Sequence, residues 1–219
     1  GIDPDFAILS DQADREAALA DAVAACRGQL EESPSKPSQL LPVITRLLDE
    51  CVHPDEIEGL LKGQRHASDV AAVYRSYRSV LLQSNALDFA TLLALCIELL
   101  EKRPAVAKQV RRVYEYVCVD EFQDTNQAQF RLLTSIVADN SPNLFVVADD
   151  DQIIYQWNGA DPARLTELQE RYEMATIQLP ENYRCPPQVI SLANKLIAHN
   201  SDRAADKQPL AANKAAAAG

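Results

Sequence analysis

The fold class is decided by residues 116–126, which read YVCVDEFQDTN. Four apolar residues, 116–119, run directly into Asp120 and Glu121. A short continuous apolar run of this kind is typical of a parallel strand that helices bury on both faces. Because ligands bind beyond the carboxyl ends of such strands, we expect the two carboxylates at a ligand-binding edge.

The sequence after this stretch repeats the pattern. A helix-like stretch, QAQFRLLTSIVAD, leads to a second apolar run at 144–148, which ends in Asp149, Asp150 and Asp151. A helix is expected at about 161–172, a third strand at 175–179 and a last helix from Pro187 to about His199. Residues 105–200 therefore predict an α/β fold, a parallel sheet with flanking helices.

The sequence before residue 105 has a different periodicity. From Ser10 to about Glu101 the apolar residues recur at helical spacing, with no convincing alternation of period two. Helices are expected at 11–30, 38–51, 54–62, 67–84 and 88–102, with Ser10, followed by Asp11, placed to cap the first and Asp88 placed to cap the last. In the last, one apolar face is expected to contain Phe89, Leu92, Leu93, Cys96, Leu99 and Leu100.

These patterns give three segments. Residues 1–104 are predicted to form an all-helical subdomain, residues 105–200 the α/β part, and residues 201–219, which end in NKAAAAG, a linker or tail.

Composition excludes several classes of protein. The 219 residues carry a net charge of −11, which argues against holding nucleic acid by broad phosphate neutralisation, so any such contact must be local. No run of about 20 apolar residues is present, so no membrane partner is expected. The five cysteines form no C-x-x-C pair, which indicates neither a disulfide framework nor a zinc knuckle and favours the cytoplasm.

Two strand ends carry residues suited to a nucleoside triphosphate. At the first, one of Asp120 and Glu121 can hold Mg²⁺ while the other orients or deprotonates the attacking water. Two solvated acids that merely end a strand are the alternative. At the second, the amide of Gln152 can sense a phosphate, and Tyr155 and Trp157 can stack on nucleobases or be core residues. Asp149 and Asp150 also fit an ordinary turn or helix cap.

A third stretch, LPENYRC at 179–185, places an aromatic ring beside a cation. Tyr183 can stack on a base, and Arg184 can reach a phosphate.

In order and spacing, VDEFQDTN, ADDDQIIYQWNGAD and LPENYR resemble motifs II, III and IV of the UvrD/Rep family of superfamily 1 DNA helicases. LDFATLL, at 87–93, resembles the segment that this family carries upstream of motif II. The resemblance implies part of a RecA-like, P-loop NTPase-type sheet, preceded by the helical insertion of the first motor domain. It also implies ATP and Mg²⁺ as cofactors.

The resemblance implies a role for each candidate residue. Asp120 would be the Mg²⁺ ligand, Glu121 the catalytic base, Gln152 a γ-phosphate sensor linked to DNA, Tyr183 the adenine-stacking ring, Arg184 a γ-phosphate contact, and Tyr155 and Trp157 the residues that stack on single-stranded DNA.

The chain also departs from the family. Ala148 stands where the family usually has Gly, and Asn158 where it usually has Arg. No G-x-x-x-x-G-K-[S/T] stretch is present, so we expect an internal segment of a longer helicase, inactive alone and lacking the second motor domain.

The function implied for the full-length protein is an ATP-dependent 3′-to-5′ DNA helicase, which couples hydrolysis to translocation on single-stranded DNA and to duplex unwinding. Its expected partners are single-stranded DNA, duplex junctions and the remaining helicase domains of the parent chain. Two alternatives stay open: the motor part of a RecB- or AddA-like helicase-nuclease, and a degenerate single-stranded-DNA-binding module without ATPase activity. A P-loop upstream would exclude the binding module, and a C-terminal nuclease domain would indicate the helicase-nuclease.

Overall fold

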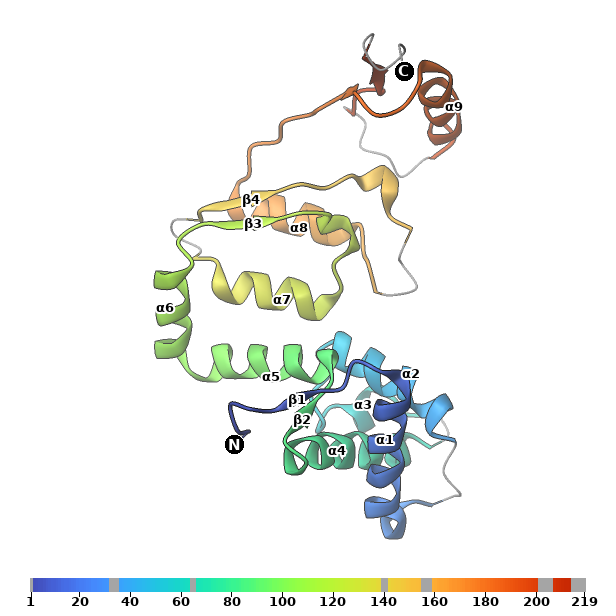
Figure 1. Cartoon of the computed structure of the whole chain (residues 1–219), viewed down its shortest axis with the longest axis vertical. Coiled ribbons are helices and arrows are strands. Elements are labelled where there is room, and N and C mark those ends of the chain that lie inside the picture. Colours follow the sequence, from blue (N-terminus) through green and yellow to red (C-terminus); the bar gives the residue numbers. More distant parts are fainter. Residues whose placement is uncertain are drawn as a thin grey trace.

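The computed structural model describes residues 2–31, 36–63, 66–138, 142–154, 159–200 and 207–213. Three groups of elements follow one another along the molecule: a helical part, a layer around two central strands, and a small unit containing α9 (Figure 1). Within the described residues, no helix combines the length and apolar character needed to cross a bilayer.

The helical part is built around α1 (Gln12–Cys26), which packs on α4 (Ala67–Gln83). Its core contains Leu19, Ile44 and Tyr77, none of which is exposed. The predicted cap Asp88 is confirmed, because its side chain accepts a hydrogen bond from the Thr91 amide. The first helix is capped one residue later than predicted, by Asp11 rather than Ser10, and the Asp11 side chain accepts a hydrogen bond from the Ala13 amide. The elements are α1 (Gln12–Cys26), η1 (Arg27–Gln29), α2 (Pro37–Asp49), α3 (Ile57–Leu60), α4 (Ala67–Gln83) and α5 (Phe89–Lys102).

Two further details of this part differ from the prediction. It is not all helical, because β1 (Ala7–Ile8) pairs in parallel with β2 (Ala86–Leu87). The predicted apolar face of α5 is confirmed at Leu100, which is buried, but it is wrong at Phe89, which is 60% exposed, and at Leu99, which is 50% exposed. The other buried positions of the helix are Thr91, Ala94 and Ile97. Because α5 is apolar around most of its circumference, its packing on α2 and α7 decides which face is buried.

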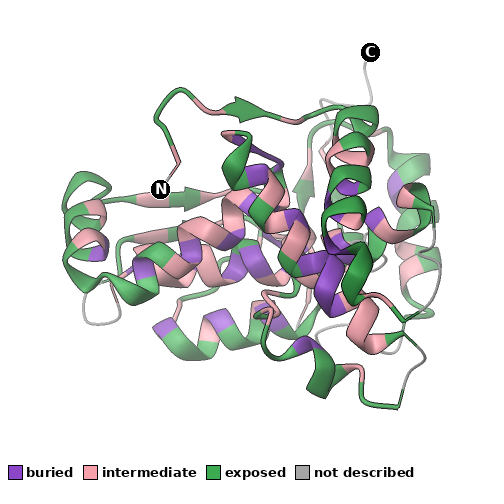
Figure 2. Ribbon diagram, turned by 90° about the horizontal axis from the view of Figure 1, so that it is seen from below, coloured by how far each residue is buried: buried purple, intermediate pink, exposed green. Residues whose placement is uncertain are grey.

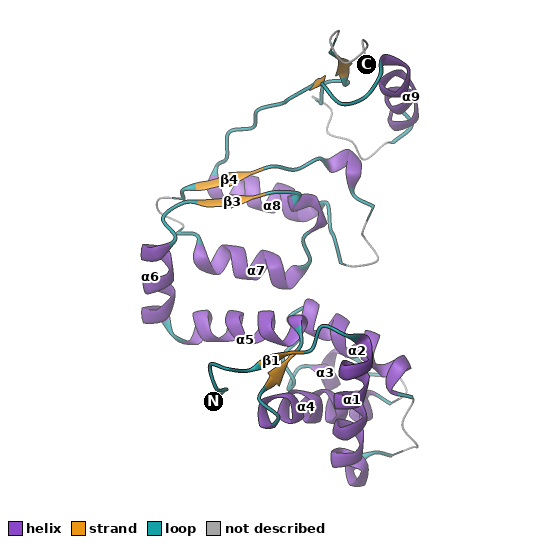
Figure 3. Cartoon of the chain, viewed as in Figure 1, coloured by secondary structure: helices purple, strands orange, loops and turns teal. Residues whose placement is uncertain are grey.

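The central layer contains two parallel strands. In it, β3 (Val117–Val119) and β4 (Leu144–Val146) pair in register, Val117 opposite Leu144 and Val119 opposite Val146. Around them lie α6 (Pro104–Val113), η2 (Phe122–Asp124), α7 (Gln127–Ile136), η3 (Asp150–Gln152) and α8 (Ala163–Tyr172) (Figure 3). This arrangement confirms a mixed α/β fold with short parallel strands.

Within the described ranges only one face of the strand pair is covered, so these residues do not show the expected burial on both faces. Phe122, Phe130 and Leu168 form a core against the inward-facing strand residues. On the other face, Cys118 is exposed and Phe145 is 63% exposed. Figure 2 shows the same contrast, with the buried positions concentrated on the helices. Strand residues alternate between faces, and the described residues supply covering helices for one of them.

The predicted third strand at 175–179 is also wrong. These residues run extended without pairing among the described residues, and Ile177 is 81% exposed. The strand instead comes later, as β5 (Glu181–Asn182), which pairs in parallel with β6 (Ala211–Ala212) beside α9 (Pro187–Ile197). An apolar run forms a strand only where a partner strand is available. The segment boundaries given above stay predictions.

Candidate nucleotide site

The acids of the first motif lie beyond the end of β3. Pairing with the β4 segment continues past the strands, because the Val147 amide donates to the Val119 carbonyl at 2.8 Å and the Phe122 amide to the Val147 carbonyl at 3.0 Å. Asp120 and Glu121 project from this joined edge, and both are exposed. The prediction that they end a parallel strand is therefore confirmed.

Glu121 has an unusual backbone conformation. Its φ of 50° and ψ of 41° lie in the left-handed region, which a residue with a side chain adopts at a cost of about 1–3 kcal/mol. The strained residue lies between β3 and η2. Its backbone amide donates a hydrogen bond to Asp120 Oδ1 at 2.9 Å. Strain of this kind concentrates at functional sites, which supports the choice of Glu121 as a candidate residue.

Gln123 joins the two strand ends. Its side chain is buried, with 5% exposure, and its Nε2 donates to Glu121 Oε2 at 2.6 Å. Its Oε1 accepts the amide of Asp149 at 3.0 Å. One amide group therefore links the acid that follows β3 to the backbone that follows β4.

The acids after β4 form a capped turn. Asp149 is the N-cap of η3, and its Oδ1 accepts the Asp151 amide at 3.1 Å. This confirms that Asp149 fits a helix cap. The Nε2 of Gln152 donates to Asp149 Oδ2 at 2.6 Å, so the predicted phosphate sensor lies on the same turn.

Lys207 reaches this turn from the segment before β6. Its Nζ lies 2.6 Å from Asp149 Oδ1, 2.9 Å from Asp151 Oδ2, and also contacts Asp150 Oδ1. Although partial burial raises the pKa of Asp149, hydrogen bonds from Lys207 and Gln152 outweigh it and bring this pKa below its ordinary value. The three carboxylates are close enough together for a cation site, but the ammonium of Lys207 contacts all three.

The residues of the third motif belong to the α9 unit. Tyr183 is 69% exposed, and its hydroxyl donates to Glu181 Oε2 at 2.6 Å. The backbone amide of Arg184 donates to Asn182 Oδ1 at 3.0 Å. Among the described residues, no hydrogen bond or ion pair joins either side chain to Asp120 or Glu121. The structure thus brings Asp120, Glu121 and Gln152 together and places Tyr183 and Arg184 on the neighbouring unit.

The two predicted DNA-stacking residues, Tyr155 and Trp157, lie outside the described residues. The chain is described again from Gly159, which has a φ of 88°. Arg164, on α8, is 7% exposed and donates to the Gly159 carbonyl. It also donates to the Thr125 carbonyl at 2.9 Å and to Gln127 Oε1 at 3.2 Å. This buried guanidinium links Gly159 to the first motif.

A second buried link joins the first motif to the helical part. Asn126 caps α7 in a reciprocal capping box with Gln129, and its Nδ2 donates to Asp49 Oδ1 at 3.0 Å. Sequence reasoning placed Gln123 and Asn126 in the VDEFQDTN motif without giving either a role, and it missed Arg164, Lys207 and Asp49 as parts of this region. Only the capping box, Asn126 with Gln129 three residues later, is readable from the sequence.

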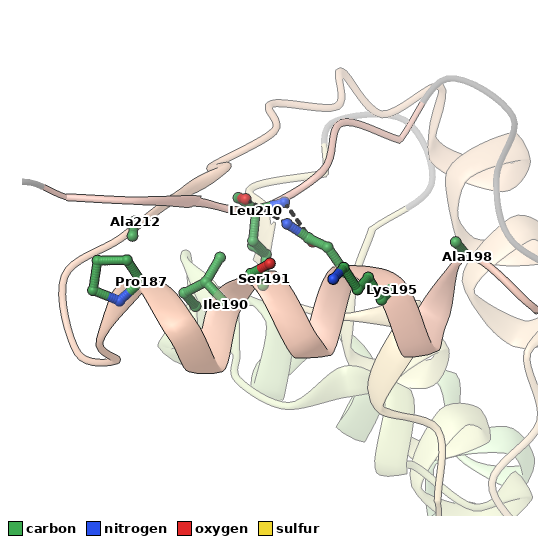
Figure 4. A pocket seen from close by; sticks show the side chains of 8 residues that line it. Pro187, Ile190, Ser191, Lys195, Ala198, Leu210 and Ala212 are labelled. Atoms are coloured by element: carbon green, nitrogen blue, oxygen red, sulfur yellow. Dashed lines mark hydrogen bonds between the residues drawn. The ribbon is translucent and has the colours of Figure 1, made fainter.

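Two hollows lined by described residues lie elsewhere. One of about 480 Å³ lies between α9 and β6, lined by residues that include Pro187, Ile190 and Leu210 (Figure 4). Asn194 closes it with two hydrogen bonds to the Leu210 backbone. A second, of about 190 Å³, lies beside Val117, at the amino end of β3. The candidate site is therefore an open edge rather than one of these hollows.

The oxygen donors of this edge fit a hard cation. Asp120 is exposed, and among the described residues only its Oδ1 accepts a hydrogen bond, which leaves Oδ2 for a ligand. Carboxylate oxygen is the ligand type that Mg²⁺ prefers, usually with several of its waters kept. Glu121 is the next residue along the chain. A site that holds Mg²⁺ and activates a water molecule needs a second carboxylate close to the one that binds the ion.

These features define the chain as an α/β protein with an acidic site at the carboxyl ends of two parallel strands, attached to a helical subdomain. The sequence profile of the UvrD/REP helicase N-terminal domain matches residues 1–173. The chain belongs to this family, which confirms the resemblance stated from the motifs.

Individual relatives agree. The chain is 34% identical over 204 residues to the ATP-dependent DNA helicase PcrA of Staphylococcus epidermidis and 34% identical over 209 residues to that of Bacillus subtilis. Each match covers 93% of this chain and 27% of the relative. It is 34% identical over 173 residues to DNA helicase II of Haemophilus influenzae, 79% of this chain and 23% of that protein. The chain thus spans about a quarter of the length of these relatives.

Proposed function

We propose that this chain is the part of an ATP-dependent DNA helicase that carries motifs II to IV and the helical insertion of the first motor domain. The full-length protein hydrolyses ATP, moves 3′-to-5′ along single-stranded DNA in the cytoplasm and unwinds duplex at junctions. The chain supplies one side of a RecA-like nucleotide site, and the remaining domains of the parent supply the other.

The observation that carries this proposal is the joined strand edge. Asp120 and Glu121 follow β3, Gln152 follows β4, and the buried amide of Gln123 binds one oxygen of Glu121 while it accepts the Asp149 amide. Two solvated acids that merely end a strand need no such buried link. The names of the relatives, ATP-dependent DNA helicase PcrA and DNA helicase II, support the same conclusion.

Each side chain has a role in this proposal. Asp120 holds Mg²⁺, which neutralises charge on the phosphates when bound. Glu121 accepts the proton of the attacking water, and Gln152 hydrogen-bonds the γ-phosphate. Arg184 adds positive charge at the γ-phosphate, and Tyr183 stacks on adenine.

Tyr155 and Trp157 belong to the DNA-binding part of the proposal. In it, their rings stack on successive bases of the single strand, each contact stabilising the complex by roughly 1–3 kcal/mol. The net charge of −11 makes such local stacking more important than broad phosphate contact.

The test is Glu121→Gln in the full-length protein. The amide keeps the shape of the side chain and removes the base, so DNA-stimulated ATP turnover should fall by about 10²–10⁴-fold while ATP binding is kept. Glu115→Gln is the matched control, because Glu115 is exposed and precedes β3. Turnover in Glu121→Gln within a few-fold of the control would contradict the role of Glu121 and, with it, the proposed function.

A further inference from the structure

Gln123 is a buried polar side chain whose two hydrogen bonds connect different segments. With 5% exposure it has little access to water, so its amide must find partners within the protein. Those partners are Glu121 Oε2, which accepts from Nε2 at 2.6 Å, and the Asp149 amide, which donates to Oε1 at 3.0 Å. Both the donor and the acceptor ends of the amide are therefore used.

The hydrogen bonds continue beyond Gln123. Asp149 Oδ2 accepts a hydrogen bond from Gln152 Nε2 at 2.6 Å. The Glu121 carboxylate, the Gln123 amide, Asp149 and the Gln152 amide thus form one chain of contacts across the two strand ends. Two of these groups, Glu121 and Gln152, are the proposed base and the proposed phosphate sensor.

Glu121 needs such a contact because of its position. It is exposed and stands on a left-handed backbone, with the three rotatable bonds of a glutamate side chain. Without a partner the carboxylate would sample many rotamers and lose entropy on each productive encounter. A charge-assisted bond from a buried, immobile donor holds one oxygen and leaves the other for the attacking water.

We propose that Gln123 is a positioning residue for ATP hydrolysis: its amide holds the Glu121 carboxylate at a fixed position relative to the turn formed by residues 149–152. This inference rests on the proposed function, and deepens it by assigning a residue that acts through the base. Gln123 acts through Glu121, whose Oε2 its Nε2 contacts at 2.6 Å.

Two substitutions separate the two hydrogen bonds. Gln123→Met keeps the length and volume of the side chain and removes both bonds. Gln123→Glu keeps an acceptor for the Asp149 amide but replaces the donor to Glu121 with a second carboxylate. Gln109→Met is the matched control, because Gln109 is exposed on α6.

In the full-length protein, both Gln123 variants should lower kcat for DNA-stimulated ATP hydrolysis by about 10- to 100-fold, with KM for ATP within about three-fold of wild type, because a misplaced group loses rate rather than substrate affinity. Gln109→Met should keep wild-type values of both. If Gln123→Met unfolds the protein, Gln123→Glu still tests the donor bond, since it keeps the link to Asp149.

A double-mutant cycle distinguishes positioning from general structural damage. If Gln123 acts through Glu121, adding Gln123→Met to Glu121→Gln should lower the residual kcat by less than about two-fold. A full 10-fold or greater further loss, or Gln123→Glu with wild-type kcat, would overturn the positioning role. These outcomes do not contradict the proposed function. The proposed function fails only if the single variant Glu121→Gln keeps the ATP turnover of wild type.

Discussion

The carboxyl of Asp49 offers a quantitative test of the junction between the helical part and the first motif. Asp49 is the last residue of α2, where the helix dipole is negative, and it accepts a hydrogen bond from Asn126. Burial, with further contributions from the charges of Asp88 and Glu50, raises the pKa of Asp49 from 3.8 to about 6 although the Asn126 bond opposes the rise. The substitution Asp49→Asn removes the charge and keeps an oxygen for Asn126.

The direction of the effect follows from proton linkage. The folded state keeps this proton up to about pH 6, whereas the unfolded chain releases it near pH 3.8. The favourable contribution is complete below pH 3.8 and is lost as the pH rises through 6. A rise of about two units corresponds to about 3 kcal/mol, which solvent around a partly buried group reduces to about 1–3 kcal/mol.

The assay is urea unfolding of this chain at pH 5, 6, 7 and 8, followed by circular dichroism. Asp49→Asn should be more stable than wild type by about 1–3 kcal/mol at pH 8, and the difference should shrink as the pH falls toward 5. Glu50→Gln is the matched control, since Glu50 is the exposed neighbour, and it should show a far smaller change. A variant no more stable than wild type at pH 8, or a difference independent of pH, would refute this reasoning.

Three further predictions concern other contacts. Arg164→Met should destabilise the chain by about 2–4 kcal/mol in the same unfolding assay, because the carbonyls of Thr125 and Gly159 lose a buried charged donor, and an unchanged midpoint would contradict this. Lys207→Met should speed proteolysis after α9 in low salt and abolish the salt dependence of that cleavage, whereas equal cleavage of both proteins would show that the ion pairs are unimportant. Trp157 is the only tryptophan, so oligo-dT should quench its fluorescence in the full-length protein, and an unchanged spectrum at saturating DNA would exclude stacking.

The parts of the structure that the sequence predicts are those with local causes. Asp88 caps its helix through an amide three residues away. The strands at 117–119 and 144–146 are recognisable in the sequence as apolar runs that are followed by acidic residues. Each signal is contained in a few consecutive residues, so no knowledge of the rest of the fold is needed to interpret it.

The failed predictions depended on partners distant in the chain. Residues 175–179 have a strand-like composition, yet no described strand lies beside them, and Ile177 and Leu179 stay more than 80% exposed. In α5, where apolar residues surround most of the helix, Phe89 is exposed because neighbouring helices cover the opposite side. Local sequence gives the presence of apolar residues but not the direction from which they are covered.

The same reason explains which contacts of the site escaped sequence analysis. Asp120 and Glu121 are visible because they follow a strand directly. Gln123 and Arg164 contact backbone atoms 26 and 39 residues away, Asp149 and Thr125 respectively. Neither contact leaves a pattern in the sequence, since an amide or guanidinium that binds distant backbone has no required spacing from it.

Asp149 shows why a charged residue is needed where these contacts meet. Its backbone amide donates a hydrogen bond to Gln123 Oε1, and its Oδ2 accepts one from Gln152 Nε2. Its Oδ1 accepts hydrogen bonds from the Asp151 amide and from the Lys207 ammonium. An asparagine here would keep one acceptor oxygen and present an NH₂ group to either the amide of Gln152 or the ammonium, so one contact would become a clash of donors. Because a carboxylate alone accepts on both oxygens, this one side chain can hold the β4 turn and the segment before β6 together at the edge that carries Glu121.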